Sequence, residues 1–372
     1  MTISESLAQK VGTKVANRVR RYKRNADMLG KWIGYELGQT APRMYPQRMY
    51  IESTNVCNLR CVMCPTGRRE VERKKGYMDI NLFKRIVDEM APHVQATTLH
   101  IWGEPLLHPK IFEMIAYCRE KGLRSEMSTN ATLLSEDKAR KILEAGLDVI
   151  YLCMDGATKE TYESIRRRAN FEETQTNIRR FMELRRAMGL SRPQINLQII
   201  QMEKTRDEID AFLQQWTIPG VDRLNVKPFD SWASQIDEIE SLRPKDEESF
   251  HIPGHRYACP NLWYHVHIYW NGDLAMCDRD FNLDTPLGNV VEAGGVMRAW
   301  RGRLFQELRR RHISGDFSAS PCNQCSEWAW WKPTPFGGGQ GNRPDNTAAL
   351  NNPAAAPESG ALVGLGDIPV LS

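Results

Sequence analysis

The sequence predicts an α/β fold in which a parallel sheet is followed by a small C-terminal domain of α+β type. Three observations lead to this prediction. Between Arg48 and Pro228, short β-branched runs alternate with longer helical patterns. An acidic, irregular stretch follows Phe229, and a compact cysteine-bearing segment then runs to Trp331. Because strands joined by helical crossovers pair in parallel, the larger domain should contain a parallel sheet.

Six strands are predicted in the larger domain, each a short run bounded by polar or turn-forming residues. They are residues 48–54, 97–103, 124–130, 148–156, 195–201 and 223–229. The intervening helices are expected to begin near Asn81, Lys110, Ser135, Lys159 and Thr205. Ser135, followed by Asp137, provides an N-cap and an acidic first turn. Since ligands of parallel α/β sheets bind at the carboxyl ends of the strands, we expect the functional groups there.

The composition is that of a globular chain of 372 residues without a dominant charge. Its 50 Lys and Arg residues stand against 46 Asp and Glu residues, and the net charge of +4 is too small to favour nucleic acid as a partner. No apolar run reaches the roughly 20 residues of a transmembrane helix, and the start of the chain does not resemble a secretory signal. We therefore expect a cytoplasmic protein with no transmembrane segment.

Composition and pattern divide the chain into five predicted segments. They are a basic N-terminal helical segment (1–46), the α/β domain (47–228), a linker (229–256), a cysteine-bearing domain (257–332) and a tail (333–372). The tail is rich in Gly, Pro, Asn and Ala, so we expect it to be disordered. In the cysteine-bearing domain, Asn271 and Gly272 lie between two β-type runs and predict a hairpin with a type I′ turn.

The nine cysteines are too many to be disulfides in a reducing compartment, which indicates metal binding or chemistry. Seven of them fall into two groups. The first group is Cys57, Cys61 and Cys64, and the second is Cys259, Cys277, Cys322 and Cys325. Cys118 stands alone in an amphipathic helical pattern, where we expect it to be buried packing.

The first group places three thiols in one loop directly after a predicted strand. A structural zinc site uses four ligands, whereas three cysteines leave one iron of a cubane cluster open to another ligand. The C-x3-C-x2-C spacing, with Met63 before the third cysteine, resembles the radical S-adenosylmethionine (SAM) superfamily. The resemblance implies a partial (β/α)6 barrel and a 4Fe–4S cluster whose open iron binds the amino and carboxylate groups of SAM. A structural zinc site is the alternative.

Further motifs that resemble this family lie at the ends of the predicted strands. Gly103, Glu104 and Pro105 match the family's G-G-E-P motif, with Trp102 in place of the first glycine. The resemblance implies that this motif approaches the methionine amino group of SAM. Other SAM contacts implied by the resemblance are Ser128, Asn130, Asp155, Arg166 and Gln198. In related enzymes the matching arginine pairs with the SAM carboxylate, and the glutamine strand borders the nucleoside.

The second group resembles the opening of the SPASM motif, because twelve residues, Gly272 and four residues separate Cys259 from Cys277. Cys322 and Cys325 follow much later, and no cysteine comes after them. Four cysteines can ligate one 4Fe–4S cluster completely, as in the shorter twitch version of the module. The resemblance thus implies one auxiliary cluster without an open iron, which would transfer electrons. A four-cysteine zinc ribbon is the alternative.

Cys153 lies two residues before Asp155 on a predicted strand, so both side chains should point to the same face. If that face is the barrel interior, the thiol could donate a hydrogen atom to a substrate radical. The alternative is that Cys153 is a small apolar residue that only fills space.

The resemblance as a whole implies a radical SAM enzyme that forms a 5′-deoxyadenosyl radical with an electron from a flavodoxin or ferredoxin and abstracts a hydrogen atom from a C–H bond. The arrangement resembles the twitch-domain enzymes that oxidise an alcohol on a sugar or aminocyclitol, which implies a small polar metabolite as the substrate. Modification of a ribosomally made peptide is the alternative, which the short segment before the first strand disfavours. From another class, a non-catalytic zinc-binding scaffold remains open.

Overall fold

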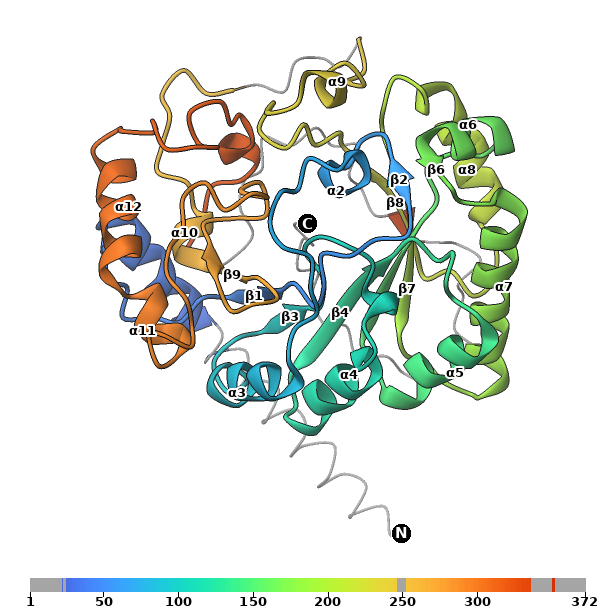
Figure 1. Ribbon diagram of the computed structural model, residues 1–372, viewed down its shortest axis with the longest axis horizontal. Helices are drawn as coiled ribbons and strands as arrows, with labels where there is room; N and C mark the ends of the chain where they lie inside the picture. Colours follow the sequence, from blue (N-terminus) through green and yellow to red (C-terminus); the bar gives the residue numbers. More distant parts are fainter. Residues whose placement is uncertain (1–21, 23–24, 246–251, 336–349, 352–372) are drawn as a thin grey trace, which may run out of the picture.

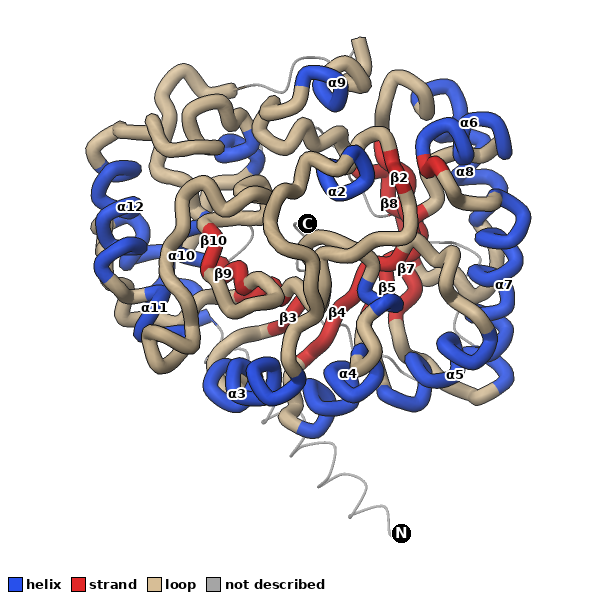
Figure 2. Tube along the Cα trace, viewed as in Figure 1, coloured by secondary structure: helices blue, strands red, loops and turns tan. Residues whose placement is uncertain are grey.

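The computed structural model describes residues 22, 25–245, 252–335 and 350–351. Its centre is a nine-stranded sheet with the order β10-β9-β1-β3-β4-β5-β7-β8-β11 (Figures 1 and 2). Six of these strands, all parallel, are the predicted strands of the larger domain. They are β1 (Arg48–Ile51), β3 (Ala96–Thr98), β4 (Arg124–Thr129), β5 (Val149–Cys153), β7 (Gln194–Ile200) and β8 (Arg223–Lys227). The predicted α/β class and the partial barrel are confirmed.

Helices cover the outer side of this curved sheet, as Figures 1 and 2 show for α3, α4, α5 and α7. The helices of the barrel are α2 (Pro65–Arg68), α3 (Ile80–Met90), α4 (Ile111–Glu120), α5 (Glu136–Ala145), α6 (Lys159–Ile165), α7 (Phe171–Ala187) and α8 (Ile209–Trp216). Two 3-10 turns, η1 (Pro105–Leu107) and η2 (Arg206–Glu208), precede α4 and α8. The predicted cap is present, since the Ser135 side chain accepts a hydrogen bond from the N–H of Lys138.

The interval after β5 differs from the prediction of a single helix beginning near Lys159. It contains two helices, α6 and α7, and each has its own N-cap, Thr158 and Asn170. Between them lies β6 (Arg166–Arg167), which pairs with β2 (Arg60–Cys61) to form a separate antiparallel ribbon. Two-residue strands carry too little periodicity to be found in a sequence, and their pairing is made across about a hundred residues.

The C-terminal module continues the sheet of the barrel. Its strand β9 (His265–Ile268) pairs in parallel with β1, with Arg48 opposite His265, and β10 (Leu274–Ala275) pairs antiparallel with β9. The predicted hairpin is therefore present, but its turn is not of type I′. Gly272 has a φ of +89°, Asn271 has a negative φ, and the N–H of Gly272 bonds to the carbonyl of Tyr269 at 2.8 Å. This is a type I turn followed by a left-handed glycine.

Short helices complete the module. They are α10 (Asn261–Tyr264), α11 (Val296–Trp300), α12 (Arg303–Ile313) and the 3-10 turn η3 (Glu327–Trp330). Helix α9 (Asp237–Glu240) precedes the module, in the predicted linker, where Glu238 pairs with Arg68. Residues 25–36 are helical, and the N-terminal segment packs on this module, where Tyr35 donates to the carbonyl of Ala258 at 2.6 Å. None of the described helices has the length and apolar character that a membrane span requires.

Half of the predicted basic N-terminal segment, residues 1–21 and 23–24, and most of the predicted disordered tail lie outside the described residues. Within the tail, β11 (Leu350–Asn351) is described and pairs antiparallel with β8. The five domain boundaries stay predictions.

Candidate active site

The first cysteine group lies in the loop that follows β1, at the carboxyl end of the parallel strands. Cys61 is held in the ribbon β2–β6, opposite Arg166. Cys64 precedes α2, and its carbonyl accepts the N–H of Arg68 at 2.9 Å. Helix α2 lies so close to β2 that a Cβ on Gly67 would be 2.4 Å from the carbonyl oxygen of Cys61. Glycine at this position therefore allows the contact that positions the second and third cysteines.

Burial sets the chemistry of these thiols. It raises the pKa of Cys57 to about 12, and it also raises the pKa values of Cys61 and Cys64. Such thiols become good ligands when a metal cation replaces the proton. Among the described residues, no three His, Cys, Asp or Glu side chains lie where they could hold one metal ion. In a cubane cluster each of three cysteines binds a different iron, so the three thiols need not converge on one point.

The predicted Gly103-Glu104-Pro105 motif forms a turn against the chain that leads into Cys57. The N–H of Glu104 bonds to the carbonyl of Val56 at 2.8 Å. Gly103 has a φ of +80°, and a Cβ there would lie 2.4 Å from the carbonyl oxygen of Thr54. The turn can approach the cysteine loop this closely only with glycine at position 103.

The carboxylate of Glu104 ties this turn to the end of β4. It accepts hydrogen bonds from the N–H of Leu106 at 3.0 Å, the hydroxyl of Thr129 at 2.7 Å and the N–H of Asn130 at 2.8 Å. Asn130 in turn donates from its side chain to the side chain of Asn58 at 3.0 Å, next to Cys57. Pro105 begins the buried 3-10 turn η1. Glu104 and Asn130 thus join the cysteine loop, the turn and β4 into one rigid unit.

Asp155 and Arg166 form a buried ion pair beside the same loop. The Nη2 of Arg166 lies 2.6 Å from the Oδ2 of Asp155, and the other carboxylate oxygen accepts the N–H of Ile200 at 2.8 Å. Because Arg166 is also the ribbon partner of Cys61, this pair connects β5 and β7 to the second cysteine.

Ser128, Cys153 and Gln198 come together on one face of the sheet. The Cys153 sulfur lies 3.2 Å from the hydroxyl oxygen of Ser128 and accepts a hydrogen bond from the Gln198 side-chain amide at 2.9 Å. The ring Nδ1 of His100 accepts the N–H of Ser128 at 3.0 Å. These side chains come from the carboxyl ends of β4, β5 and β7 and from the loop after β3. Their roles toward SAM and substrate stay predictions.

The second cysteine group surrounds one cavity in the C-terminal module. Cys259, Cys277, Cys322 and Cys325 all line it, together with Arg279 and Glu327. Burial raises the pKa of each of these four thiols. Residues that lie 66 positions apart along the chain, from 259 to 325, therefore converge on one space with four sulfur donors, as a fully ligated 4Fe–4S cluster requires.

A segment of the predicted linker connects the two cysteine sites. Trp232 donates its indole N–H to the carbonyl of Met63 at 2.8 Å, and its ring contacts Trp102 with centroids 4.8 Å apart. At the other end, Asp230 pairs with Arg279 at 2.6 Å, and Ser231 donates to Glu327 at 2.9 Å. Residues 229–236 thus form a bridge from the loop of the first group to the lining of the second cavity.

The backbone of this bridge is strained, because Trp232, Ala233 and Ser234 all have positive φ values, of 57°, 62° and 53°. Each left-handed non-glycine residue costs roughly 1–2 kcal/mol, which the contacts at both ends must offset. Sequence reasoning missed Trp232, Arg279 and Glu327. The one available signal was Trp102, which stands where the family motif has glycine and which packs on Trp232.

Comparison with known proteins agrees with this geometry. The family model of the radical SAM superfamily matches residues 51–211, and that of the SPASM iron–sulfur cluster-binding domain matches residues 259–326. These ranges contain the first and the second cysteine groups, respectively.

Two curated relatives are similar over most of the chain. A tungsten-containing aldehyde ferredoxin oxidoreductase cofactor-modifying protein of Pyrococcus furiosus is 28% identical over 69% of this chain and 73% of its own length. The mycofactocin maturase MftC of Mycobacterium tuberculosis is 23% identical over 74% of this chain and 75% of its own length. Three further relatives are matched over less than half of their own length.

Among solved structures, that of Streptococcus suis SuiB bound to the precursor peptide SuiA has the same fold. It is 13% identical, with a TM-score of 0.56 over 82% of this chain and 76% of that one. The two family models match the parts of the chain that form the barrel and the two cysteine sites. We conclude that the chain belongs to the radical SAM superfamily and carries a SPASM iron–sulfur cluster-binding domain.

Proposed function

We propose that this radical SAM enzyme, which uses SAM and 4Fe–4S clusters, oxidises a C–H bond of a small polar substrate held between its two cluster sites. The observation that carries the proposal is the pair of cysteine sites joined by one bridge: three cysteines in the loop after β1, and four that line one cavity of the C-terminal module. When bound, SAM and the clusters supply a 5′-deoxyadenosyl radical that takes a hydrogen atom, and a second centre that accepts the electron left on the substrate.

The chain's own residues bind and orient these groups. We assign Cys57, Cys61 and Cys64 to the SAM-binding cluster, and Cys259, Cys277, Cys322 and Cys325 to the auxiliary cluster. Glu104 and Asn130 hold the turn at positions 103–105 against the cysteine loop. Arg166 keeps a guanidinium beside Cys61, and its pairing with Asp155 fixes the orientation of that group. These contacts support a SAM pocket whose walls are set before the ligand arrives.

Polar groups at the strand ends favour a hydroxyl-bearing or amine-bearing substrate. His100, Ser128 and Gln198 supply uncharged hydrogen-bonding groups around Cys153, since burial lowers the pKa of His100 to about 3. A sugar or aminocyclitol presents matching hydroxyl and amino groups. The Cys153 thiol is held by contacts with Ser128 and Gln198. If this thiol returned a hydrogen atom to the substrate radical, the product would be an epimer and not an oxidised compound, so that role belongs to an alternative outcome of the same site.

Maturation of a ribosomally made peptide is the second candidate. It is favoured by the similarity to a mycofactocin maturase and by the fold shared with SuiB, which was solved with a precursor peptide. The two candidates differ in what must stimulate SAM cleavage.

The test is to reconstitute the full chain anaerobically and to measure 5′-deoxyadenosine with dithionite as the reductant. A panel of sugars and aminocyclitols is compared with a panel of precursor peptides. We expect about eight irons and eight sulfides per chain and stimulation by a small polar compound. Stimulation by peptides alone would replace the first candidate by the second. A zinc-containing protein without labile sulfide, or one unable to cleave SAM, would contradict both.

A further inference from the structure

The ribbon β2–β6 has one side toward the first cysteine site and one side toward solvent. Cys61 and Arg166 face each other across it and are 7% and 6% exposed, whereas Arg60 faces Arg167, which is exposed. Successive side chains of a strand point to opposite faces, so the two pairs lie on opposite sides of the ribbon. A single layer of backbone therefore separates a cysteine of the first group from a basic surface.

Neighbouring arginines extend this surface at both ends. After β6, the N–H of Ala169 bonds to the carbonyl of Arg166 at 2.9 Å, and Arg168 sits in this turn with a φ of 74° and an exposed side chain. On the other side, α2 packs directly on β2 and ends at Arg68, followed by the exposed Arg69. We call the five residues Arg60, Arg68, Arg69, Arg167 and Arg168 the ribbon surface.

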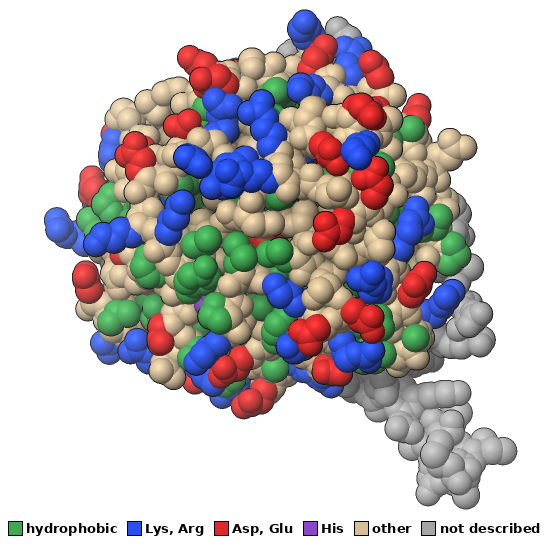
Figure 3. Space-filling view, turned by 45° about the vertical axis from the view of Figure 1, so that its right-hand side comes forward, with side chains coloured by type: hydrophobic (Ala, Val, Ile, Leu, Met, Phe, Trp, Pro, Cys, Tyr) green, Lys and Arg blue, Asp and Glu red, His purple; other side chains and the backbone are tan. Residues whose placement is uncertain are grey.

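The charge of the ribbon surface is largely uncompensated. Arg68 pairs with Glu238 at 3.4 Å, and Arg60 donates to the carbonyl of Leu59 at 2.7 Å. Within the described part of the chain, the side chains of Arg69, Arg167 and Arg168 make no hydrogen bond or ion pair. Figure 3 shows one face of the molecule, on which basic and acidic side chains are interspersed and one group of Lys and Arg side chains lies above an apolar area. Exposed arginines without internal partners leave a positive potential at this surface, which attracts an anionic partner.

We propose that the ribbon surface docks an acidic one-electron carrier protein of the flavodoxin or ferredoxin type. This inference rests on the proposed function, because each SAM cleavage consumes one electron at the first cluster. One electron passes from the reduced carrier to the enzyme, the carrier is oxidised, and no atom is transferred. A partner packed on the ribbon lies on the order of 10 Å from it, the spacing of two stacked sheets, so the transfer distance is short.

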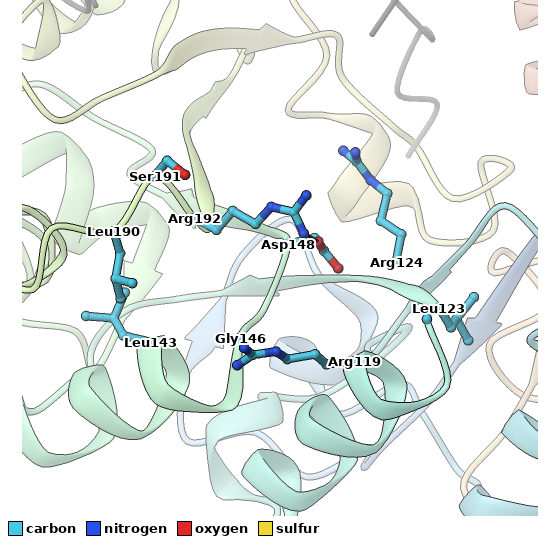
Figure 4. A pocket seen from close by; sticks show the side chains of 10 residues that line it. Arg119, Leu123, Arg124, Leu143, Gly146, Asp148, Leu190, Ser191 and Arg192 are labelled. Carbon is cyan, nitrogen blue, oxygen red and sulfur yellow. Dashed lines mark hydrogen bonds and ion pairs between the residues drawn. The ribbon is translucent and has the colours of Figure 1, made fainter. Parts of the chain in front are cut away.

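A second basic area provides a matched control. A cavity of about 490 Å³ opens at the amino end of the sheet, in the loops that precede β4, β5 and β7 (Figure 4). Arg119, Arg124 and Arg192 line it, and Arg192 pairs with Asp148 at 2.7 Å. Because this cavity lies at the edge of the sheet opposite the cysteine loop, a carrier docked there would be separated from the first cluster by the length of the strands.

The experiment compares two double variants of the reconstituted full chain, Arg167→Glu with Arg168→Glu and Arg119→Glu with Arg192→Glu, the latter at two exposed positions of the cavity. Substrate-independent SAM cleavage is driven in turn by reduced flavodoxin, by reduced ferredoxin and by dithionite. We expect charge reversal on the ribbon surface to raise the carrier concentration for half-maximal rate by about ten-fold or more, and the wild-type rate with carrier to fall with added salt. The cavity variant should behave as wild type, and all three proteins should respond equally to dithionite.

Direct binding of oxidised flavodoxin and ferredoxin to the same proteins, measured by calorimetry, gives a readout that does not need turnover. Weaker binding in the ribbon variant alone supports the surface, even if SAM cleavage fails in every protein and the proposed function is thereby wrong. If the ribbon variant and the wild type bound the carriers equally and cleaved SAM at equal carrier-driven rates, the inference would be overturned. SAM cleavage driven by dithionite would then still leave the proposed function intact. Weaker carrier binding in the cavity variant alone would also overturn the inference.

Discussion

Trp232 donates its indole N–H to the main-chain carbonyl of Met63 at 2.8 Å, so a residue from the predicted linker holds the loop of the first cysteine group. The main-chain N–H of Trp232 donates to the carboxylate of Asp230 at 2.9 Å. The main-chain carbonyl of Trp232 accepts a hydrogen bond from the side-chain amide of Gln235 at 2.6 Å. The cysteine loop and the C-terminal module are therefore not independent, because one tryptophan contacts the loop while its neighbours contact Arg279 and Glu327.

The contact between Trp232 and Met63 can be tested with a pair of tryptophan variants. Trp232→Phe should cost about 1 kcal/mol of stability, the usual value of one hydrogen bond, and should slow SAM cleavage by dithionite because the cysteine loop loosens. Trp263→Phe removes an equivalent bond, of the same 2.8 Å length, to the carbonyl of Gln39 far from that loop. The melting temperature should fall by a similar amount in both variants. Equal rates of SAM cleavage in both variants would show that the contact with Met63 has no effect on the site.

Removing single cysteines should separate the two cluster sites. Cys61→Ala should leave about four irons per chain and abolish SAM cleavage, whereas Cys259→Ala should also lower the iron content and leave cleavage with dithionite measurable. Cys118 is fully buried in α4 and belongs to neither group. Cys118→Ala should therefore keep about eight irons. Iron and sulfide analysis with electron paramagnetic resonance distinguishes the three, and loss of all iron in Cys259→Ala would mean that the sites are not independent.

The close contact between α2 and β2 predicts a strong effect of one methyl group. In Gly67→Ala the new Cβ would lie 2.4 Å from the carbonyl oxygen and 2.6 Å from the nitrogen of Cys61. Because both neighbours are backbone atoms, the ribbon or the helix must move, and we expect the variant to lose the iron of the first site. Gly254→Ala is the control, since a Cβ there meets nothing within 4 Å. Normal visible absorption and SAM cleavage in Gly67→Ala would contradict the predicted displacement.

The stability of the C-terminal module should depend on pH through Asp280. Burial raises the pKa of this carboxyl from 3.8 to about 7, so the folded protein holds a proton that the unfolded chain releases. The unfolded state therefore binds fewer protons between these pH values, and stability is lost as pH rises from 3.8 toward 7, by on the order of 4 kcal/mol in total. Asp280→Asn should flatten the change of melting temperature between pH 5 and about 7.5, and an unchanged slope would refute the assignment.

The sequence predicted the features that depend on short-range pattern or on a recognisable motif. The six barrel strands, the cap at Ser135 and the hairpin near Gly272 follow from short-range pattern, and all are present, although the hairpin turn is not of the predicted type I′. The cysteine groups were found by spacing, and the structure brings the four cysteines of the second group to one cavity.

Features that depend on contacts between distant segments were not predictable. The ribbon between Arg60–Cys61 and Arg166–Arg167 has two residues in each strand, too few for a periodic signal. The bridge at Trp232 lies in a stretch whose acidic composition is typical of a linker, although its side chains reach Met63 on one side and Glu327 through Ser231 on the other. Composition describes the average character of such a stretch and misses the few side chains that hold it.

The parallel pairing of β9 with β1 has a consequence for how the chain can be divided. Strand β1 opens the barrel, yet on one side its main-chain groups are satisfied only by a strand that arrives more than two hundred residues later. A fragment ending before β9 would expose this edge, and a bare strand edge is a template for aggregation. The barrel should therefore be obtained intact only together with the segment that completes its edge, and proteolytic removal of that segment should yield precipitate instead of a smaller enzyme.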